Sequence, residues 1–206
     1  RAMRGRFVTF EGIDGAGKST HLDWFVGTLR RRGLDVVQTR EPGGSPLAES
    51  LRELLLHREM PIDTELLLMF AARRDHLDRL IRPTLADGRW VVCDRFTDST
   101  YAYQGAGRGA SIERIAWLEN WVHGDLQPDR TYLFDLDASL AAQRRTAARA
   151  PDRFEVQDVA FFERVRRAYR DRAQGDPGRF VVLDGGQSIA EIRVMLEQDI
   201  ASVWNT

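Results

Sequence analysis

The feature that most constrains this chain is a glycine-rich loop between an apolar run and a segment with helical periodicity. Residues 7–11 read FVTFE, residues 12–19 read GIDGAGKS and fit G-x-x-x-x-G-K-[ST], and residues 21–33 read HLDWFVGTLRRRG. Glycines let successive backbone N–H groups turn toward a phosphate, and the following helix adds the partial positive charge of its N-terminus. The lysine bridges the β- and γ-phosphates, and the hydroxyl can ligate Mg²⁺. We therefore predict that ATP or GTP is held by Gly12, Ile13, Asp14, Gly15, Ala16, Gly17, Lys18, Ser19 and Thr20.

The same loop serves kinases, switches, transporters and motors, so the rest of the chain must decide among these classes. The sequence has no Asn-Lys-x-Asp tetrapeptide, the guanine reader of GTPase switches. Residues 183–187 read LDGGQ, like a signature of ABC transporter ATPases, but no apolar strand ending in Asp-Glu follows them. We interpret this segment as a strand end and a turn. The switch and transporter classes therefore lose support.

Short apolar runs alternate with longer helical patterns along the chain. The expected strands are residues 7–11, 35–40, 89–94, 130–136 and 179–184. One long helix is expected from Pro61 to Gly88, with Pro83 as the point of any bend. The alternation predicts an α/β fold of the P-loop NTPase type, a doubly wound five-stranded parallel sheet with helices on both faces. A length of 206 residues without a linker composition predicts a single domain over residues 3–206.

Two segments interrupt this alternation. Residues 104–109, QGAGRG, are rich in glycine, and we expect a loop there that lies close to backbone or ligand. Residues 143–155 carry four arginines around Pro151, which breaks helices. A solvated helix face is the ordinary interpretation of such a charge run. A mobile lid at about 143–155 is the functional interpretation, and it depends on the resemblance described below.

Composition excludes several other classes of function. The 30 Lys and Arg residues nearly balance the 31 Asp and Glu residues, so we expect neither nucleic acid nor a membrane surface as partner. The one cysteine, Cys93, lies in the apolar run WVVC and is expected to be buried rather than reactive or metal-binding. The longest apolar stretches fall short of the roughly 20 residues that span a bilayer. Without a signal-peptide pattern, a cytoplasmic protein is expected.

Four segments, taken in order, resemble thymidylate kinases. They are FEGIDGAGKST at 10–20, TREPGG at 39–44, LLLMFAARRDH at 66–76 and CDRFTDSTYAYQGAGRG at 93–109. Their combination is far more specific than the phosphate-binding loop alone. The resemblance implies a homodimer that transfers the γ-phosphoryl group of ATP to dTMP, giving dTDP in dTTP biosynthesis, with Mg²⁺ as cofactor.

The resemblance assigns catalytic roles at one expected strand end and in the basic segment. Asp94 and Arg95 lie at the end of an expected strand, at the sheet edge that carries the phosphate-binding loop, where ligands of open α/β sheets gather. The planar guanidinium of Arg95 could bind the acceptor phosphate and the migrating phosphoryl group at the same time. Gly15 stands where one branch of the family carries a P-loop arginine, so the chain resembles the bacterial type with lid arginines. The expected catalytic residues are Asp14, Lys18, Asp94, Arg95, Arg149 and Arg153, and the expected metal-binding residues are Ser19 and Asp94.

The same resemblance predicts the acceptor site. Phe70 and Arg74 share a helix face at a spacing of four residues, and in the family this pair stacks on thymine and bonds its O4. Tyr103 is expected where a ribose 2′-OH would clash. Without the resemblance, Phe70 is more ordinary as a core residue, and the Asp94 and Arg95 pair is compatible with a structural salt bridge. The residues expected to bind dTMP are Asp14, Glu41, Pro42, Phe70, Arg74, Arg95, Ser99, Tyr103 and Gln104.

Two other functions remain open from the sequence. One is another small P-loop nucleotide or deoxynucleoside kinase, and the other is a nucleotide-regulated binding protein. Apolar stripes on residues 63–82 and 111–124 suit a helix-packed dimer interface, although Trp117 and Trp121 are equally compatible with a core. Because the attacking group is already an ionised phosphate oxygen, no protein base is expected and transfer is expected to be direct, without a phosphoenzyme.

Overall fold

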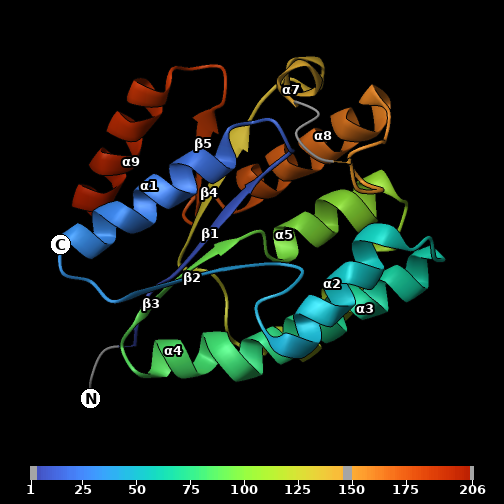
Figure 1. Ribbon diagram of the computed structural model, residues 1–206, viewed down its shortest axis with the longest axis horizontal. Helices are drawn as coiled ribbons and strands as arrows, with labels where there is room; N and C mark the ends of the chain where they lie inside the picture. Colours follow the sequence, from blue (N-terminus) through green and yellow to red (C-terminus); the bar gives the residue numbers. More distant parts are fainter. Residues whose placement is uncertain (1–3, 146–149, 205–206) are drawn as a thin grey trace.

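Five parallel strands form the centre of the molecule (Figure 1). The computed structural model describes residues 4–145 and 150–204. Within these residues the sheet has the order β2-β3-β1-β4-β5, and every neighbouring pair is parallel. The predicted five-stranded parallel α/β fold is therefore confirmed. The strands are β1 Phe7–Gly12, β2 Val36–Arg40, β3 Trp90–Asp94, β4 Arg130–Asp135 and β5 Phe180–Asp184.

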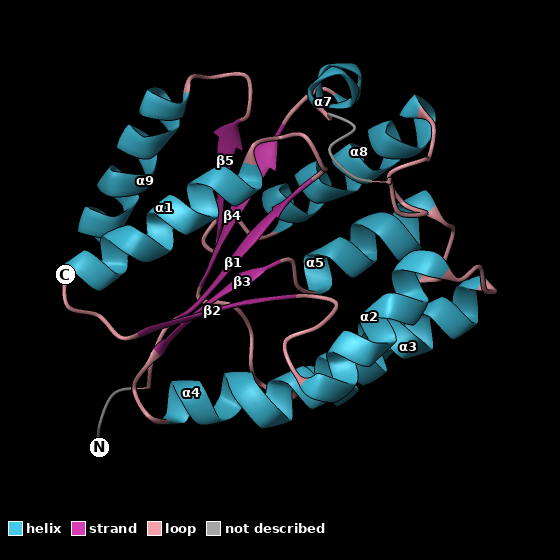
Figure 2. Ribbon diagram, in the orientation of Figure 1, coloured by secondary structure: helices cyan, strands magenta, loops and turns pink. Residues whose placement is uncertain are grey.

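Helices cover both faces of the sheet (Figure 2). On one face, α1 (Lys18–Arg31) packs on β1, β2 and β3, and α9 (Ile189–Val203) packs on β5 beside α1. On the other face, α8 (Val159–Gly175) packs on β4 and β5, α5 (Thr97–Ser99) on β1, and α4 (Arg82–Ala86) on β3. The remaining helical segments are α2 Pro46–His57, α3 Ile62–His76, η1 Leu77–Ile81, η2 Thr100–Gly107, α6 Ile112–His123 and α7 Ala138–Arg144.

All six residues of β1 are buried, because both sides of this central strand face helices. Successive side chains alternate between the two faces. Phe10 meets the ring of Phe25 on α1 at a centroid distance of 5.3 Å, whereas Phe7 meets Phe96 on the opposite face at 5.0 Å. Glu11 lies on the Phe7 side and is also fully buried. A buried carboxyl in the central strand requires partners, and these partners belong to the site described below.

The long helix expected from Pro61 to Gly88 is largely confirmed. The α3, η1 and α4 segments follow one another without a break from Ile62 to Ala86. The wider turns of η1 immediately precede Pro83, whose ring would clash with the carbonyl group four residues earlier in a regular α-helix. The departure from α-helical geometry therefore lies just before the proline.

The prediction of a loop at residues 104–109 was wrong for most of that segment. The helical turns of η2 continue through Gly107. A Cβ on Gly105 would lie 3.1 Å from Ile112, and one on Gly107 would lie 2.6 Å from the ring of Phe161. The glycines therefore let η2 pack closely against α6 and α8. They do not break the helical segment, and their lack of a side chain makes room for Ile112 and Phe161 on the neighbouring helices.

Candidate active site

The loop between β1 and α1 surrounds the first of the neighbouring cavities at the carboxyl edge of the sheet. Gly12 has a φ of 139°, and a Cβ on it would lie 2.5 Å from the carbonyl oxygen of Phe134, so only glycine fits where the chain leaves β1. The cavity measures about 610 Å³. Gly12 shapes this loop without lining the cavity, and the other expected phosphate-binding residues all line it: Ile13, Asp14, Gly15, Ala16, Gly17, Lys18, Ser19 and Thr20.

Two arginines that were not among the expected site residues bond to residues that line this first cavity. Arg144 lines it and donates to the carbonyl oxygen of Gly185 at 2.6 Å. Arg145 donates to the carbonyl oxygen of Asp14 at 3.1 Å. Gly185 follows the end of β5, which confirms a strand end and a turn in the LDGGQ segment. The arginine-rich composition of residues 143–155 was the signal that pointed to this region.

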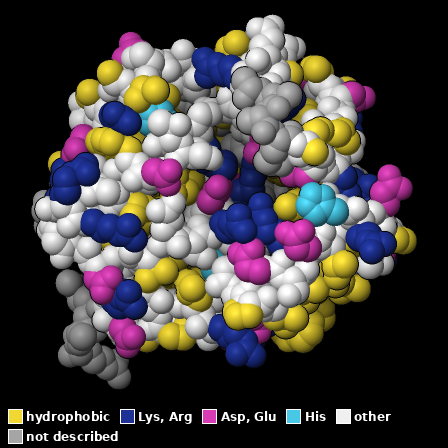
Figure 3. Space-filling model, in the orientation of Figure 1, with side chains coloured by type: hydrophobic (Ala, Val, Ile, Leu, Met, Phe, Trp, Pro, Cys, Tyr) yellow, Lys and Arg dark blue, Asp and Glu magenta, His cyan; other side chains and the backbone are white. Residues whose placement is uncertain are grey.

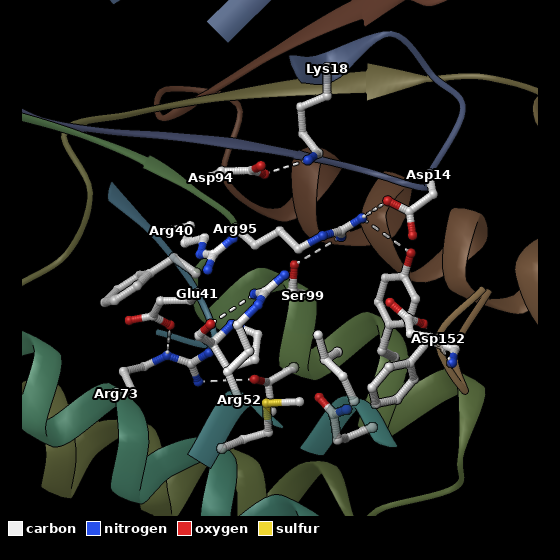
Figure 4. A pocket seen from close by; sticks show the side chains of 18 of the residues that line it. Asp14, Lys18, Arg40, Glu41, Arg52, Arg73, Asp94, Arg95, Ser99 and Asp152 are labelled. Atoms are coloured by element: carbon white, nitrogen blue, oxygen red, sulfur yellow. Dashed lines mark hydrogen bonds and ion pairs between the residues drawn. The ribbon is translucent and has the colours of Figure 1, made fainter. Parts of the chain in front are cut away.

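A second cavity of about 230 Å³ lies beside the first and shares Asp14, Lys18 and Ser19 with it. Lys and Arg side chains gather around a hollow in the middle of this face (Figure 3), and Figure 4 shows the side chains of this second cavity. Seven of the nine residues expected at an acceptor line it: Asp14, Glu41, Pro42, Arg95, Ser99, Tyr103 and Gln104.

Lys18 and Asp94 form an ion pair where the two cavities meet (Figure 4). The Lys18 side chain is buried, whereas that of Asp94 is about one-third exposed. Lys18 begins the helix after β1 and Asp94 ends β3, and these strands are parallel neighbours. Their carboxyl ends therefore deliver both side chains to the same edge of the sheet, as the sequence predicted.

Arg95 is the one non-glycine residue with a positive φ, 69°, in the described part of the chain. Such a conformation costs on the order of 1 kcal/mol, and it recurs at functional sites. Its guanidinium donates to Asp14 at 3.2 Å, to the hydroxyl of Ser99 at 3.3 Å and to the hydroxyl of Tyr169 at 3.1 Å. Figure 4 shows this guanidinium between Asp14 and Ser99. The strained turn thus aims a planar donor group into the second cavity.

Glu11 stabilises the turn that carries Arg95 through hydrogen bonds, and the sequence did not reveal this role. Its carboxyl accepts the backbone N–H of Phe96 at 2.7 Å, the hydroxyl of Ser99 at 2.5 Å and the hydroxyl of Tyr169 at 2.7 Å. Burial and the neighbouring Asp98 raise the pKa of Glu11 to about 7, and Arg95 offsets part of that rise. Both hydroxyl groups that Glu11 accepts from also bond Arg95, so Glu11 fixes the surroundings of that guanidinium.

Asp14 stays ionised opposite Arg95. Burial alone would raise the pKa of this carboxyl, but the charges of Arg95 and Lys18 more than offset the burial and hold its pKa below the ordinary value. A carboxylate in this position orients the guanidinium of Arg95 by a charge-assisted hydrogen bond. The expected link between the phosphate-binding loop and Arg95 is present.

Glu41 lies at the far wall of the second cavity with two basic partners. It accepts from Arg73 at 2.6 Å and bonds the Nδ1 of His76 at 2.9 Å, and all three side chains are buried. Burial would raise the pKa of Glu41, but Arg73 and His76 hold it below the ordinary value. Arg73 also donates to the hydroxyl of Thr100 at 2.9 Å. Its guanidinium is therefore fixed before any ligand binds.

Arg73 takes the place expected for Arg74, and this corrects the predicted helix register. Met69 and Arg73 line the second cavity, whereas neither Phe70 nor Arg74 lines it. Phe70 is buried under the guanidinium of Arg73, and Arg74 is half exposed and bonds Asp78 at 2.7 Å. Consecutive residues of an α-helix are turned by about 100°, so a shift of one residue turns Arg74 toward solvent.

The expected lid arginines lie away from the phosphate-binding loop or outside the described residues. Arg153 forms an ion pair with Glu65 on α3 and donates to the carbonyl oxygen of Leu55 at 2.7 Å. It lines neither cavity, so the structure does not bring it to the P-loop. Arg149 lies outside the described residues. Mobility of residues 143–155 stays a prediction.

Sequence reasoning also missed Arg40, Arg52 and Thr100, which line the second cavity. Arg40 ends β2 inside the TREPGG segment, so its position at the carboxyl edge was an available signal. Arg52 donates to the carbonyl oxygen of Pro42 at 2.8 Å, and nothing in the spacing of α2 marked it. Positive charge at this cavity therefore comes from several separate elements.

Oxygen donors at the junction of the cavities fit a hard cation. Ser19 and Asp94 both line the second cavity, and hydroxyl and carboxylate oxygens are ligands that Mg²⁺ accepts. Over residues 4–145 and 150–204, no three His, Cys, Asp or Glu side chains gather as a potential metal site. This donor set fits a Mg²⁺ ion that is bound mainly through phosphate and water oxygens. None of the described helices is both long and apolar enough to span a bilayer.

Comparisons with known proteins agree over nearly the full length. A family model described as thymidylate kinase matches residues 10–196. A thymidylate kinase from Cupriavidus metallidurans is 58% identical over 201 residues, covering 98% of this chain and 100% of the relative. One from Bordetella petrii is 56% identical over 200 residues, with 97% of each chain covered. The crystal structure of thymidylate kinase from Ehrlichia chaffeensis has a TM-score of 0.78 and 34% identity, covering 96% of this chain and 99% of that one.

The matched residues include the phosphate-binding loop, the Asp94 and Arg95 pair and the elements that line both cavities. The fold, the two adjoining cavities and the sequence likeness therefore agree. The chain belongs to the thymidylate kinase family.

Proposed function

We propose that this chain transfers the γ-phosphoryl group of ATP to dTMP, giving ADP and dTDP. The observation that carries the proposal is the meeting of the two cavities at Asp14, Lys18 and Ser19. A phosphoryl group can pass between two nucleotides only where their phosphates come together, and this junction lies at the P-loop. The relatives named above are thymidylate kinases, and their name supports ATP as donor and dTMP as acceptor here.

The larger cavity is the proposed site of ATP. Backbone N–H groups of the loop and the N-terminus of α1 face its phosphates, and Lys18 neutralises charge on the β- and γ-phosphates. Arg144 lines this cavity, and Arg145 bonds to Asp14 in its lining. Each guanidinium can release a backbone carbonyl group and bind the nucleotide instead. The predicted assignment of donor-site residues is therefore extended by two arginines.

The smaller cavity is the proposed site of dTMP. Arg95 grips the 5′-phosphate with Asp14 holding the guanidinium, and Arg40 and Arg52 add positive charge nearby. At the other end, Arg73 offers donors to the carbonyl O4 of thymine, and Glu41 keeps it in place. Met69 takes the position beside the base that was expected for Phe70. Tyr103 stacks on Arg95 and closes the sugar side.

Catalysis in this arrangement comes from positioning and charge neutralisation. The phosphate oxygen of dTMP is already a charged nucleophile, so no side chain must remove a proton from it. Lys18 on the donor side and Arg95 on the acceptor side reduce the repulsion between the two phosphates as they approach. Direct transfer in line follows, without a phosphorylated side chain as intermediate.

A Mg²⁺ ion completes the proposed site. Ser19 and Asp94 are the residues that would hold it, directly or through its waters. Ser19 lines both cavities, and Asp94 lines the second. When bound, the ion supplies charge neutralisation on the β- and γ-phosphate oxygens of ATP. Asp94 also forms an ion pair with Lys18, so the same carboxylate would interact with both the ammonium group and the Mg²⁺ ion.

The chain is proposed to work as a homodimer through an exposed apolar surface on α3 and α6. Leu67, Trp117 and Trp121 expose 59%, 65% and 66% of their surfaces. A surface hollow lies between the two helices beside Leu67 and Trp117. Exposed aromatic side chains in one patch are typical of protein interfaces. Trp117→Glu should shift the mass measured by light scattering to that of a monomer, whereas Val194→Glu on the exposed side of α9 should not.

A panel of acceptors tests the proposed function. ADP release from ATP and Mg²⁺ is measured with dTMP, dUMP, dCMP, dGMP, AMP and thymidine. A strong preference for dTMP supports the proposal, and preference for another acceptor would favour a different small P-loop kinase. Arg95→Ala should abolish acceptor-dependent turnover, whereas full biological activity of that variant would favour a nucleotide-regulated binding protein. A cytoplasmic location stays a prediction.

A further inference from the structure

Glu65 is a buried carboxyl that lines neither cavity but holds residues from two other segments. It lies near the start of α3, and its side chain is fully buried. Its Oε2 accepts from the side-chain amide of Gln104 at 3.0 Å. Its Oε1 pairs with the guanidinium of Arg153, and Arg108 lies 3.6 Å from the same oxygen. The dTMP mechanism described above does not use this carboxyl.

The hydrogen bond to Glu65 fixes the direction of the Gln104 amide. A carboxylate accepts and does not donate, so the nitrogen of the amide must face Glu65. The amide oxygen then lies on the other side of the group, and Gln104 lines the acceptor cavity. One N–H of the amide is held by Glu65, so the amide oxygen is the atom that Gln104 turns away from Glu65 and offers to a ligand in that cavity.

Thymine and cytosine differ in the group that such an oxygen would meet. N3 of thymine or uracil carries a hydrogen and donates, whereas N3 of cytosine has no hydrogen and accepts. We infer that Glu65 is a positioning residue for base specificity, which sets the polarity of Gln104 so that an N3–H pyrimidine is favoured over cytosine. The inference rests on the proposed binding of dTMP in the second cavity.

The pairing of the two Glu65 oxygens makes one substitution especially informative. In Glu65→Gln, the oxygen of the new amide stays with Arg153, because a guanidinium only donates. The new nitrogen then faces Gln104, whose amide must turn its own oxygen toward residue 65. The Gln104 nitrogen then faces the cavity, which suits N3 of cytosine and opposes N3–H of thymine.

Arg153 provides a second reason why Glu65 acts on the acceptor. Its backbone N–H donates to the carbonyl oxygen of Leu56 at 3.2 Å, in addition to its bond to Leu55. The next residue, Phe154, lines the acceptor cavity and meets the ring of Tyr103 edge-on at 6.0 Å. The pair of Glu65 on α3 and Arg153 therefore anchors the segment that carries Phe154, which forms one wall of the acceptor cavity.

The experiment measures kcat/KM for dTMP, dUMP and dCMP in the wild type and in Glu65→Gln. The ratio of dTMP to dCMP should fall by about 10-fold or more, because a buried polar group then faces the wrong partner. The ratio of dTMP to dUMP should stay within about twofold, since both bases carry N3–H. Equal losses for dTMP and dCMP would overturn the inference, because general damage to the fold has no preference between bases.

Gln104→Met shows whether Glu65 acts through Gln104. In this background, Glu65→Gln should leave the dTMP to dCMP ratio unchanged, and a further fall of the ratio would contradict the inference. If Glu65→Gln does not fold, Arg153→Met provides a second test of the Glu65 and Arg153 pair. It should raise KM for dTMP and leave KM for ATP unchanged, while a rise in KM for ATP alone would make Arg153 a donor-phosphate contact. Failure of the proposed function is distinct, since the wild type would then show no turnover of dTMP.

Discussion

The Nε of Arg73 donates to Oε2 of Glu41 at 2.6 Å, with both side chains at most 3% exposed. This buried pair fixes the one arginine of α3 that lines the acceptor cavity. The adjacent Arg74 is half exposed and pairs with Asp78 on η1, the segment that follows α3. Arg73 is therefore placed to contact a ligand in the acceptor cavity, whereas Arg74 is not.

Arg73→Met should raise KM for dTMP about 100-fold, because the base loses a charge-assisted donor and the buried Glu41 keeps only His76 of its two basic partners. Arg74→Met is the matched control and should stay within about twofold of the wild type, as exposed ion pairs contribute little. Steady-state kinetics with dTMP as the varied substrate measures both. A large effect of Arg74→Met with normal Arg73→Met would contradict the observed helix register.

Arg95→Met should lower kcat/KM for dTMP by roughly 10³-fold, since removal of a donor aimed at transition-state charge has effects of this size. The matched control is Arg89→Met, because Arg89 forms an exposed ion pair with Asp35 away from both cavities. The coupled ADP-release assay measures both variants. Similar activity in Arg95→Met and Arg89→Met would remove Arg95 from the catalytic site.

Glu11 should make the free energy of unfolding depend on pH. Its pKa is raised from 4.5 to about 7 in the fold, so between these values the folded state holds a proton that the unfolded chain has lost. Stability therefore falls as pH rises through this window, by on the order of 3 kcal/mol. Glu11→Gln has no such proton, and its stability should not show this loss.

Urea unfolding of the wild type and Glu11→Gln at several pH values from 4.5 to 8 tests this prediction. The wild type should lose stability relative to the variant as pH rises, and the difference should level off above pH 7. Parallel pH profiles of the two proteins would show that Glu11 does not titrate in this window.

Arg144→Met should raise KM for ATP about 10-fold and leave KM for dTMP unchanged, because Arg144 lines only the donor cavity. Varying each substrate at saturation of the other separates the two constants. An effect on dTMP alone would reverse the assignment of the two cavities.

The fold and the phosphate-binding loop could be predicted because their signals are local. Apolar runs mark the five strands, and a loop with Gly12 and Lys18 has few alternatives once a strand precedes it and a helix follows. Asp94 and Arg95 were found in the same way, since parallel strands bring their carboxyl ends to one edge.

What the sequence missed depends on contacts between distant elements. The glycines near residue 105 are typical of a loop, yet their neighbours are Ile112 and Phe161, which only the packed structure brings close. The choice between Arg73 and Arg74 depends on the side of α3 that meets Glu41. The position of Arg153 depends on a buried Glu65, whose partners lie 39 and 88 residues away.

The most direct test of the central claim is the stereochemistry of the transferred phosphoryl group. ATP made chiral at the γ-phosphorus by oxygen isotopes and sulfur is used with dTMP, and the configuration of the product is determined. Direct in-line transfer between the two adjoining cavities is a single displacement and predicts inversion. Retention would contradict the account, because it requires two displacements and a phosphorylated side chain between ATP and dTMP.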